Sequence, residues 1–173
     1  EDIYSFSKID MWFLSKLRNI INAENLLLNI DSPDQIGFDL FLNLKQLGFS
    51  DKQISYYTNS DELTVRLKRS RLNIIPVFKT VDTCASEFSS NTPYHYSTYE
   101  RPVFRLDNKG NILEDLNLNE VNYNHINKMM ILGGGPNRIG QGIEFDYCCC
   151  HASYQAEAEG LLTIMVNSNP ETV

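Results

Sequence analysis

The sequence has few basic residues for its length. Its 15 Lys and Arg residues are outnumbered by 22 Asp and Glu residues, which gives a net charge of −7. Affinity for a nucleic-acid backbone comes largely from the counterions that Lys and Arg displace, so this balance argues against nucleic acid as the main partner. Long hydrophobic runs are also lacking, and no apolar stretch is long enough to span a bilayer. The first residues, Glu-Asp-Ile-Tyr-Ser, carry no basic n-region, so neither a signal peptide nor a membrane partner is predicted.

Cysteine is scarce and clustered. Three of the four cysteines are consecutive, and the full set is Cys84, Cys148, Cys149 and Cys150. This arrangement suits neither a disulfide framework nor the spaced cysteine pairs of a zinc site. We therefore expect reduced thiols, a cytoplasmic protein, and a trio that packs as small hydrophobic residues on a buried helix. No metal site is predicted from the scattered histidines, which are His95, His125 and His151.

The sequence does contain enough apolar material for a folded protein. Hydrophobic residues make up 42% and charged residues 21% of the 173 positions, which is typical of globular domains. The length fits one ordinary domain or two small ones.

The first part of the chain, to about residue 70, is predicted to be all-α. Residues 8–28 carry apolar side chains at helical spacing, which are Ile9, Phe13, Leu17, Ile20 and Ile21. A second helical pattern covers residues 35–47, and Gly48 provides a C-terminal stop. Residues 50–53 read as a capping box that opens a third helix, and residues 59–62 open a fourth.

Two features of this helical part have more than one interpretation. Trp12 and Phe13 are interpreted as core residues, with an oligomer interface as the alternative. Residues 48–75 also resemble a helix-turn-helix whose second helix carries basic residues, at Arg66, Lys68, Arg69 and Arg71. DNA binding therefore stays an alternative, although the acidic total counts against it.

The middle of the chain has no sustained period. Residues 72–100 are rich in Ser, Thr, Pro and Tyr, and we expect them to wrap over a surface and to complete a helical domain of residues 1–100. Residues 101–126 are more polar and are predicted to be a linker or insertion. A tight turn is expected at residues 107–111, Asp-Asn-Lys-Gly-Asn.

The last part of the chain reads as strand, glycine loop, helix and strand. Apolar residues 129–132 and 161–166 are the strands, and residues 143–159 are the helix, which ends at Gly160. This order is a βαβ unit with parallel strands and a right-handed crossover. Two strands are not stable alone, so residues 127–173 are predicted to belong to a larger α/β domain. The fold class expected overall is α+β, an all-α domain followed by an incomplete Rossmann-like α/β unit.

The glycine loop at residues 133–142 fits neither common nucleotide fingerprint. The dinucleotide motif fits at Gly133 and Gly135, but Arg138 takes the place of its third glycine, and Asn167 the place of its acidic residue. The P-loop spacing occurs at Gly135 and Gly140, yet Gln141 and Gly142 follow where Lys and a hydroxyl residue are needed.

A glycine loop that opens a helix still offers backbone N–H groups and a partial positive charge to a small anion or polar group. Two purely structural alternatives remain open. Glu144 and Asp146 suit the first turn of a helix as stabilising charges, and the glycines suit close packing of strand, loop and helix.

Three longer stretches resemble one protein family. They are Val81-Asp-Thr-Cys-Ala-Ser-Glu-Phe with Thr92-Pro-Tyr-His-Tyr-Ser-Thr-Tyr-Glu, then Ile131-Leu-Gly-Gly-Gly-Pro-Asn-Arg-Ile-Gly-Gln-Gly-Ile-Glu-Phe-Asp-Tyr-Cys-Cys, and Val166-Asn-Ser-Asn-Pro-Glu-Thr-Val. Together they resemble the large subunit of carbamoyl phosphate synthetase. The resemblance implies a helical oligomerisation domain, followed by the start of the pre-ATP-grasp domain of the second synthetase half.

The resemblance also implies an activity for a longer protein. The family makes carbamoyl phosphate from bicarbonate, ATP and glutamine-derived ammonia, for pyrimidine and arginine synthesis. Its ATP and Mg²⁺ or Mn²⁺ sites lie in ATP-grasp domains that these residues do not match, so no catalytic residue and no cofactor are expected here, and the segment alone is expected to be inactive. Partners implied are both ATP-grasp halves, a glutaminase subunit or domain, and a second copy bound through the helical domain.

Within these residues, the resemblance implies a passage for carbamate between two active sites. Positions that match its lining are Gly142, Glu144 and Glu171, and the adjoining anion loop contains Asn137 and Arg138. Like charges in a poorly solvated channel repel, so the hypothesis is that neutral carbamic acid passes, or that one glutamate is protonated.

Residues 101–126 are expected to depart from the family by a longer connection. A rival interpretation is an independent oligomerisation or interaction module without catalysis, which would fold alone and self-associate.

Overall fold

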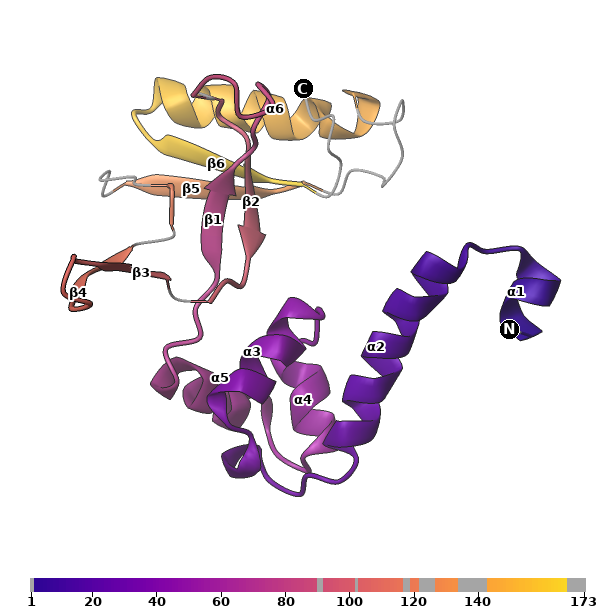
Figure 1. The fold of residues 1–173 in the computed structure, drawn as a ribbon. Helices are drawn as coiled ribbons and strands as arrows, with labels where there is room; N and C mark the ends of the chain where they lie inside the picture. Colours follow the sequence, from indigo (N-terminus) through magenta and orange to yellow (C-terminus); the bar gives the residue numbers. More distant parts are fainter. Residues whose placement is uncertain are drawn as a thin grey trace. The chain divides into compact units, whose positions relative to one another are not determined.

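The computed structural model describes residues 2–89, 92–101, 103–116, 119–121, 127–133 and 143–167. The chain divides into two compact units, residues 1–121 and 122–173. Figure 1 shows the helices and strands of each unit.

Unit 1 opens with helices, as expected. They are α1 (Asp2–Ser7), α2 (Met11–Leu27), the short 3-10 helix η1 (Pro33–Gln35), α3 (Phe38–Gln46), α4 (Asp51–Tyr57) and α5 (Glu62–Arg71). The predicted stop at Gly48 is confirmed, since its φ of +93° suits glycine. The capping box is confirmed too, because the Ser50 hydroxyl accepts from the Gln53 amide and the Gln53 side chain accepts from the Ser50 amide.

The core of unit 1 lies between the C-terminal end of α2 and helices α3 to α5. Its fully buried hydrophobic residues are Leu27, Ile36, Phe41, Leu44, Ile54 and Val65. The Tyr57 hydroxyl donates to Glu24 at 2.6 Å and ties α2 to α4. Because Glu24 lies in the last turn of α2, this hydrogen bond attaches the C-terminal end of the helix to the core.

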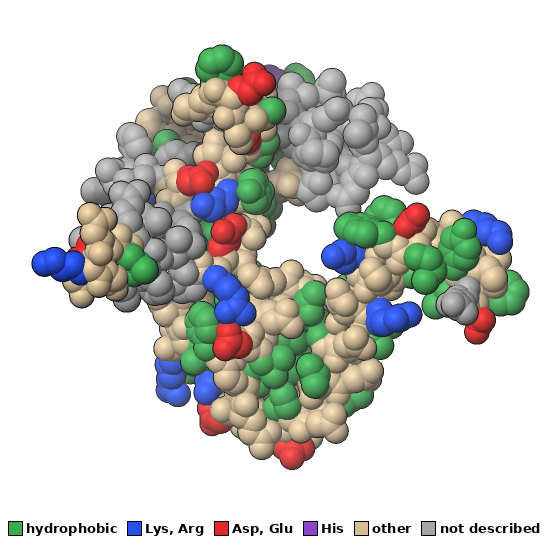
Figure 2. All heavy atoms as spheres, viewed as in Figure 1, with side chains coloured by type: hydrophobic (Ala, Val, Ile, Leu, Met, Phe, Trp, Pro, Cys, Tyr) green, Lys and Arg blue, Asp and Glu red, His purple; other side chains and the backbone are tan. Residues whose placement is uncertain are grey.

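The prediction that Trp12 and Phe13 are core residues is wrong for the described chain. Trp12 is 60% exposed and Phe13 58%, and the apolar positions Leu17 and Ile21 are both 54% exposed. Only Ala23 and Leu27 of α2 are buried, because the first turns of the helix extend beyond the other helices of unit 1. Figure 2 shows hydrophobic side chains exposed along α1 and α2.

Residues 72–100 contain more regular structure than the sequence predicted. Strands β1 (Val77–Thr80) and β2 (His95–Thr98) pair antiparallel, with Val77 opposite Thr98 and Thr80 opposite His95. The sequence pattern did not reveal these strands, because each has only four residues, too few for a sustained alternation.

Residues 101–126 also contain a hairpin within the predicted linker. Strands β3 (Val103–Leu106) and β4 (Ile112–Leu116) pair antiparallel with an irregularity after Arg105. The tight turn is confirmed: Gly110 has a φ of +82° and its amide donates to the Asp107 carbonyl at 3.0 Å.

Unit 2 has the predicted βαβ order. Strands β5 (Lys128–Leu132) and β6 (Leu162–Val166) are parallel neighbours, and α6 (Ile143–Ala158) connects them and packs against both. Gly160, with a φ of +80°, follows the helix as expected. None of the four cysteines is in a disulfide in the described part of the chain. Cys148 is exposed, so the prediction that the trio is buried is wrong at this residue.

Candidate functional site

The carboxyl edge of the β5–β6 sheet is the first candidate site. Leu132 lies opposite Val166 in the parallel register, so both strands end at the same edge. The Gly133 amide continues the ladder by donating to the Val166 carbonyl at 2.8 Å. Open parallel sheets bind ligands at this edge.

Gly133 and Asn167 meet directly at this edge. A Cβ atom placed on Gly133 would lie 2.9 Å from Nδ2 and 3.1 Å from Cγ of Asn167. Such distances are shorter than van der Waals contact allows, so a side chain at residue 133 would require the Asn167 carboxamide to move.

One of the five predicted site residues falls in a described element. Glu144 is the second residue of α6, which agrees with the expected helix start after the glycine loop. Gly142, Asn137, Arg138 and Glu171 lie outside the described residues. Their grouping around a carbamate passage therefore stays a prediction.

The exposed side of α6 carries an aromatic row that the sequence analysis missed. The rings of Tyr147 and His151 lie 4.2 Å apart and those of His151 and Tyr154 6.1 Å apart, measured between centroids. Tyr147 is 63% and Tyr154 65% exposed. Their spacings of four and three residues, which place side chains on one helix face, were the available signal.

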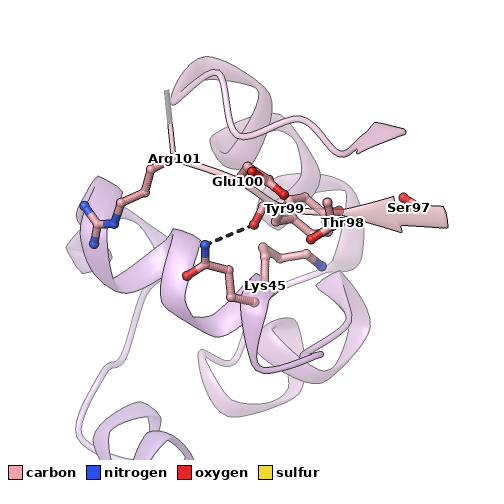
Figure 3. A pocket seen from close by; sticks show the side chains of 7 residues that line it. Lys45, Ser97, Thr98, Tyr99, Glu100 and Arg101 are labelled. Carbon is pink, nitrogen blue, oxygen red and sulfur yellow. Dashed lines mark hydrogen bonds between the residues drawn. The ribbon is translucent and has the colours of Figure 1, made fainter. Parts of the chain in front are cut away.

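A pocket in unit 1 is the second candidate site. It has a volume of about 540 Å³ and is lined by α3 and by the segment that leaves β2, through Lys45, Gln46, Ser97, Thr98, Tyr99, Glu100 and Arg101. Figure 3 shows Tyr99 and its backbone close to the two α3 side chains.

Beside this pocket, three charged side chains form a buried network. Lys45 Nζ donates to Asp51 Oδ1 at 2.9 Å and to the Phe49 carbonyl at 2.7 Å. Arg69 Nε donates to Asp51 Oδ2 at 3.1 Å, and Arg69 Nη1 donates to the Ile74 carbonyl at 2.8 Å. The Lys45 and Asp51 side chains are 7% and 10% exposed. Burial alone would raise the pKa of Asp51, but the hydrogen bonds and charges of Lys45 and Arg69 outweigh it, so the pKa is lowered.

The polar groups around the pocket are largely engaged by the chain itself. Gln46 Nε2 donates to the Tyr99 carbonyl at 3.0 Å, drawn as a dashed line in Figure 3. Arg101 Nη1 donates to Asp39 Oδ1 at 2.9 Å, and the Lys45 ammonium lies 5.3 Å from the centre of the Tyr99 ring. These contacts hold residues 99–101 against α3.

Three of the four basic residues of the helix-turn-helix alternative have partners within unit 1. Arg69 is bound to Asp51 in the buried network, Arg66 pairs with Glu62 at 3.1 Å, and Lys68 lies 3.8 Å from Asp34. A recognition helix needs basic side chains that are free to reach phosphates and bases. Arg69, which is 15% exposed, is therefore not free to contact DNA.

Among the described residues, no three His, Cys, Asp or Glu side chains lie close enough together to hold a metal ion. Within the same ranges, none of the helices combines the length and the apolar character needed to cross a bilayer.

Comparison with known proteins gives each unit a counterpart. Residues 1–73 match the family model described as the carbamoyl-phosphate synthetase large chain, oligomerisation domain. Residues 125–173 match the model described as the carbamoyl phosphate synthase preATP-grasp domain. The fold is thus a helical oligomerisation domain followed by a βαβ unit of pre-ATP-grasp type.

Relatives align with the chain as a whole. The arginine-specific, chloroplastic carbamoyl phosphate synthase large chain of rice is 49% identical over 173 residues, which cover all of this chain and 13% of the rice protein. The large chains of Rhodopirellula baltica and Archaeoglobus fulgidus are 48% and 44% identical, and each alignment covers 99% of this chain and 14% and 15% of the relative. The chain belongs to the carbamoyl phosphate synthase large-chain family, and it spans only 13–15% of the length of these relatives.

The expectation that residues 101–126 form a longer connection than in the family stays a prediction.

Proposed function

We propose that these residues serve in a large chain that makes carbamoyl phosphate from bicarbonate, ATP and glutamine-derived ammonia. The observation that carries the proposal is the identity of 44–49% along the whole chain to carbamoyl phosphate synthase large chains. ATP and Mg²⁺ or Mn²⁺ would bind in ATP-grasp domains outside these residues, and ammonia would come from a glutaminase partner. The product would feed arginine and pyrimidine synthesis in the cytoplasm, although two of the plant relatives are named as chloroplastic.

Within that enzyme, unit 1 holds the two synthetase halves together, and the carboxyl edge of unit 2 lines the passage of carbamate. Strands β5 and β6 end at the same edge of the sheet. Glu144 comes after the end of β5 in the sequence and Glu171 after the end of β6, which supports this role. Gly142 has no side chain beyond hydrogen, which suits a narrow passage.

The test uses a full-length large chain that carries these 173 residues. Gly142→Phe is expected to increase the ATP consumed per carbamoyl phosphate formed, because carbamate is blocked and decomposes before its phosphorylation. ATP hydrolysis and product formation are measured in the same reaction. An unchanged ratio with normal product formation would rule out a passage at this edge.

The charge of the carboxylates gives a second test of the passage. Glu144→Gln removes a negative charge that an anion would have to pass, so its effect on coupled synthesis should vary with pH. Synthesis that matches the unsubstituted enzyme at every pH would contradict the hypothesis of carbamic acid or a protonated glutamate.

The exposed face of α2 favours a second, compatible function, which is self-association. Phe13 and Leu17 are more than half exposed, and clustered exposed apolar residues mark interaction surfaces. We expect light scattering to give a mass above the 19.9 kDa of one chain. Leu17→Ser should reduce that mass, whereas Leu63→Ser, on α5 and 61% exposed, should not. A monomeric unsubstituted chain would exclude this function.

A further inference from the structure

Strand β2 has an outer edge, which is the side that faces away from β1. The register places Ser97 opposite Phe78. The Phe78 amide donates to Asn119 and the Phe78 carbonyl accepts from Glu120, so both backbone groups of Phe78 point away from β2. Opposite residues in an antiparallel pair either bond each other or both point outward. The amide and the carbonyl of Ser97 therefore lie on the outer edge of β2.

The two backbone groups of Ser97 are open on this edge. No described residue forms a hydrogen bond with either of them, and Ser97 is exposed. Two residues further along, where the orientation repeats, the Tyr99 carbonyl accepts from Gln46 at 3.0 Å. The edge thus has a free donor and a free acceptor just before the point where α3 binds it. Such an edge can receive an extended segment as an additional strand.

A cavity accompanies the open groups of Ser97. It has a volume of about 540 Å³, and its lining joins Ser97 and Thr98 to the side chains of Lys45 and Gln46 on α3, as Figure 3 shows. Pockets of about 300–1,000 Å³ are typical of binding sites. The Glu100 carboxylate also lines the cavity and forms no ion pair with a described residue. It therefore favours a basic side chain on the added segment.

We propose that an extended, basic segment of the large chain, from outside these 173 residues, adds to the outer edge of β2 and bonds the amide and carbonyl of Ser97. The proposal rests on the proposed place of these residues in a large chain. Because the chain covers only 13–15% of its relatives, most of a large chain would lie outside it. A covalently linked segment reaches an effective concentration of about a millimolar, well above that of a second copy in solution. The net charge of −7 also favours a basic segment.

The experiment is hydrogen exchange at single amides, measured by mass spectrometry. It uses a full-length large chain that carries these residues, without its glutaminase partner. The Ser97 amide is expected to exchange at a rate about ten-fold or more below that of an unprotected amide, because it donates to the added segment. The Phe78 amide, which donates to Asn119 at 2.9 Å, is the protected reference.

Two variants at Ser97 identify the added segment. Ser97→Pro removes the outward donor and no bond to β1, and proline is tolerated on edge strands. Exchange in a peptide from outside these residues should become several-fold faster in Ser97→Pro. Ser97→Ala keeps the backbone amide and is the matched control, so its exchange should equal that of the unsubstituted chain. The Phe78 amide should stay protected in both variants.

The outcomes separate this proposal from the proposed function. A Ser97 amide that exchanges at the unprotected rate, in a large chain that still makes carbamoyl phosphate, overturns the added strand and leaves the function standing. Protection that disappears on dilution identifies a second copy as the occupant and also overturns the proposal. A large chain that makes no carbamoyl phosphate overturns the proposed function, whereas the exchange at Ser97 still decides whether a strand is added.

Discussion

Asp51 is the residue on which the buried charges of unit 1 converge. It accepts hydrogen bonds from Lys45 on α3 and from Arg69 on α5, and all three side chains are at most 15% exposed. A buried carboxylate without these cations would be costly, and so would the cations without it. The network therefore fixes the relative placement of three helices.

Replacement of the Asp51 carboxylate should destabilise unit 1. Asp51→Asn leaves Lys45 and Arg69 buried without their counter-charge, and we expect a loss of about 3 kcal/mol in the free energy of unfolding. Urea unfolding followed by circular dichroism measures it. Glu62→Gln is the matched control, because the Arg66–Glu62 pair is 57% and 46% exposed and exposed pairs contribute about 0.5 kcal/mol or less.

The same carboxylate gives a defined pH dependence. The pKa of Asp51 is lowered from its ordinary value of 3.8, so its contribution is complete above that value and is lost as the pH falls through the folded-state pKa. The difference in stability between the unsubstituted chain and Asp51→Asn should therefore shrink in acid below 3.8. A difference that grows in acid would contradict the assignment.

At the scale of single elements, helices α2, α4 and α5 of unit 1 start at side-chain caps. Asp10, Ser50 and Asp61 each accept a hydrogen bond from an amide in the first turn of the following helix. These caps depend on residues three or fewer positions away, so the start of α4 at Ser50 and of α5 near residue 61 could be predicted from sequence. The exposure of α2 could not, because an apolar stripe has the same spacing whether or not a partner covers it.

The cap at Ser50 should contribute measurably to stability. Ser50→Ala removes the acceptor for the Gln53 amide, and we expect a loss of about 1 kcal/mol in the free energy of unfolding. Ser70→Ala, on the exposed side of α5, is the control and should change stability by less than about 0.5 kcal/mol. Equal losses in the two variants would argue against a capping role.

A matched pair of leucines on α2 tests where its packing lies. Leu27 is fully buried and Leu17 is 54% exposed. Leu27→Ala should cost about 2–5 kcal/mol through lost contacts and a cavity, and Leu17→Ala should cost less than about 1 kcal/mol. Chemical denaturation at a concentration where the chain is monomeric compares them. A larger loss in the free energy of unfolding for Leu17→Ala than for Leu27→Ala would contradict the exposure of Leu17.

At the scale of the whole molecule, hydrogen bonds join segments that are far apart in the sequence. Asn119 and Glu120, near the end of unit 1, bind the edge of β1 that lies away from β2. The Phe78 amide donates to Asn119 Oδ1 at 2.9 Å, and the Glu120 amide donates to the Phe78 carbonyl at 2.9 Å. Glu120 also accepts from the Thr80 amide at 2.8 Å and from Lys79 Nζ at 3.0 Å.

Loss of the Glu120 contacts should expose this edge of β1 to solvent. In Glu120→Ala, the amide hydrogen of Thr80 loses its acceptor, so its exchange with solvent should become several-fold faster. Hydrogen exchange measured by nuclear magnetic resonance tests this. Amides of α4 serve as an internal reference whose exchange rates should not change. An unchanged exchange rate of the Thr80 amide would contradict its hydrogen bond to Glu120.

The sequence alone determined the features that depend on near neighbours or on a long motif. These include the capped helices, the βαβ order, the turn at Asp107 and the resemblance to the large chain. Tertiary structure decided which polar and apolar groups meet across the chain: the network of Lys45, Asp51 and Arg69, the β1–β2 pair, and the contact of Asn167 with Gly133. The physical reason is that hydrogen bonding within a helix or turn is fixed by local spacing, whereas burial and long-range pairing depend on how the whole chain closes on itself.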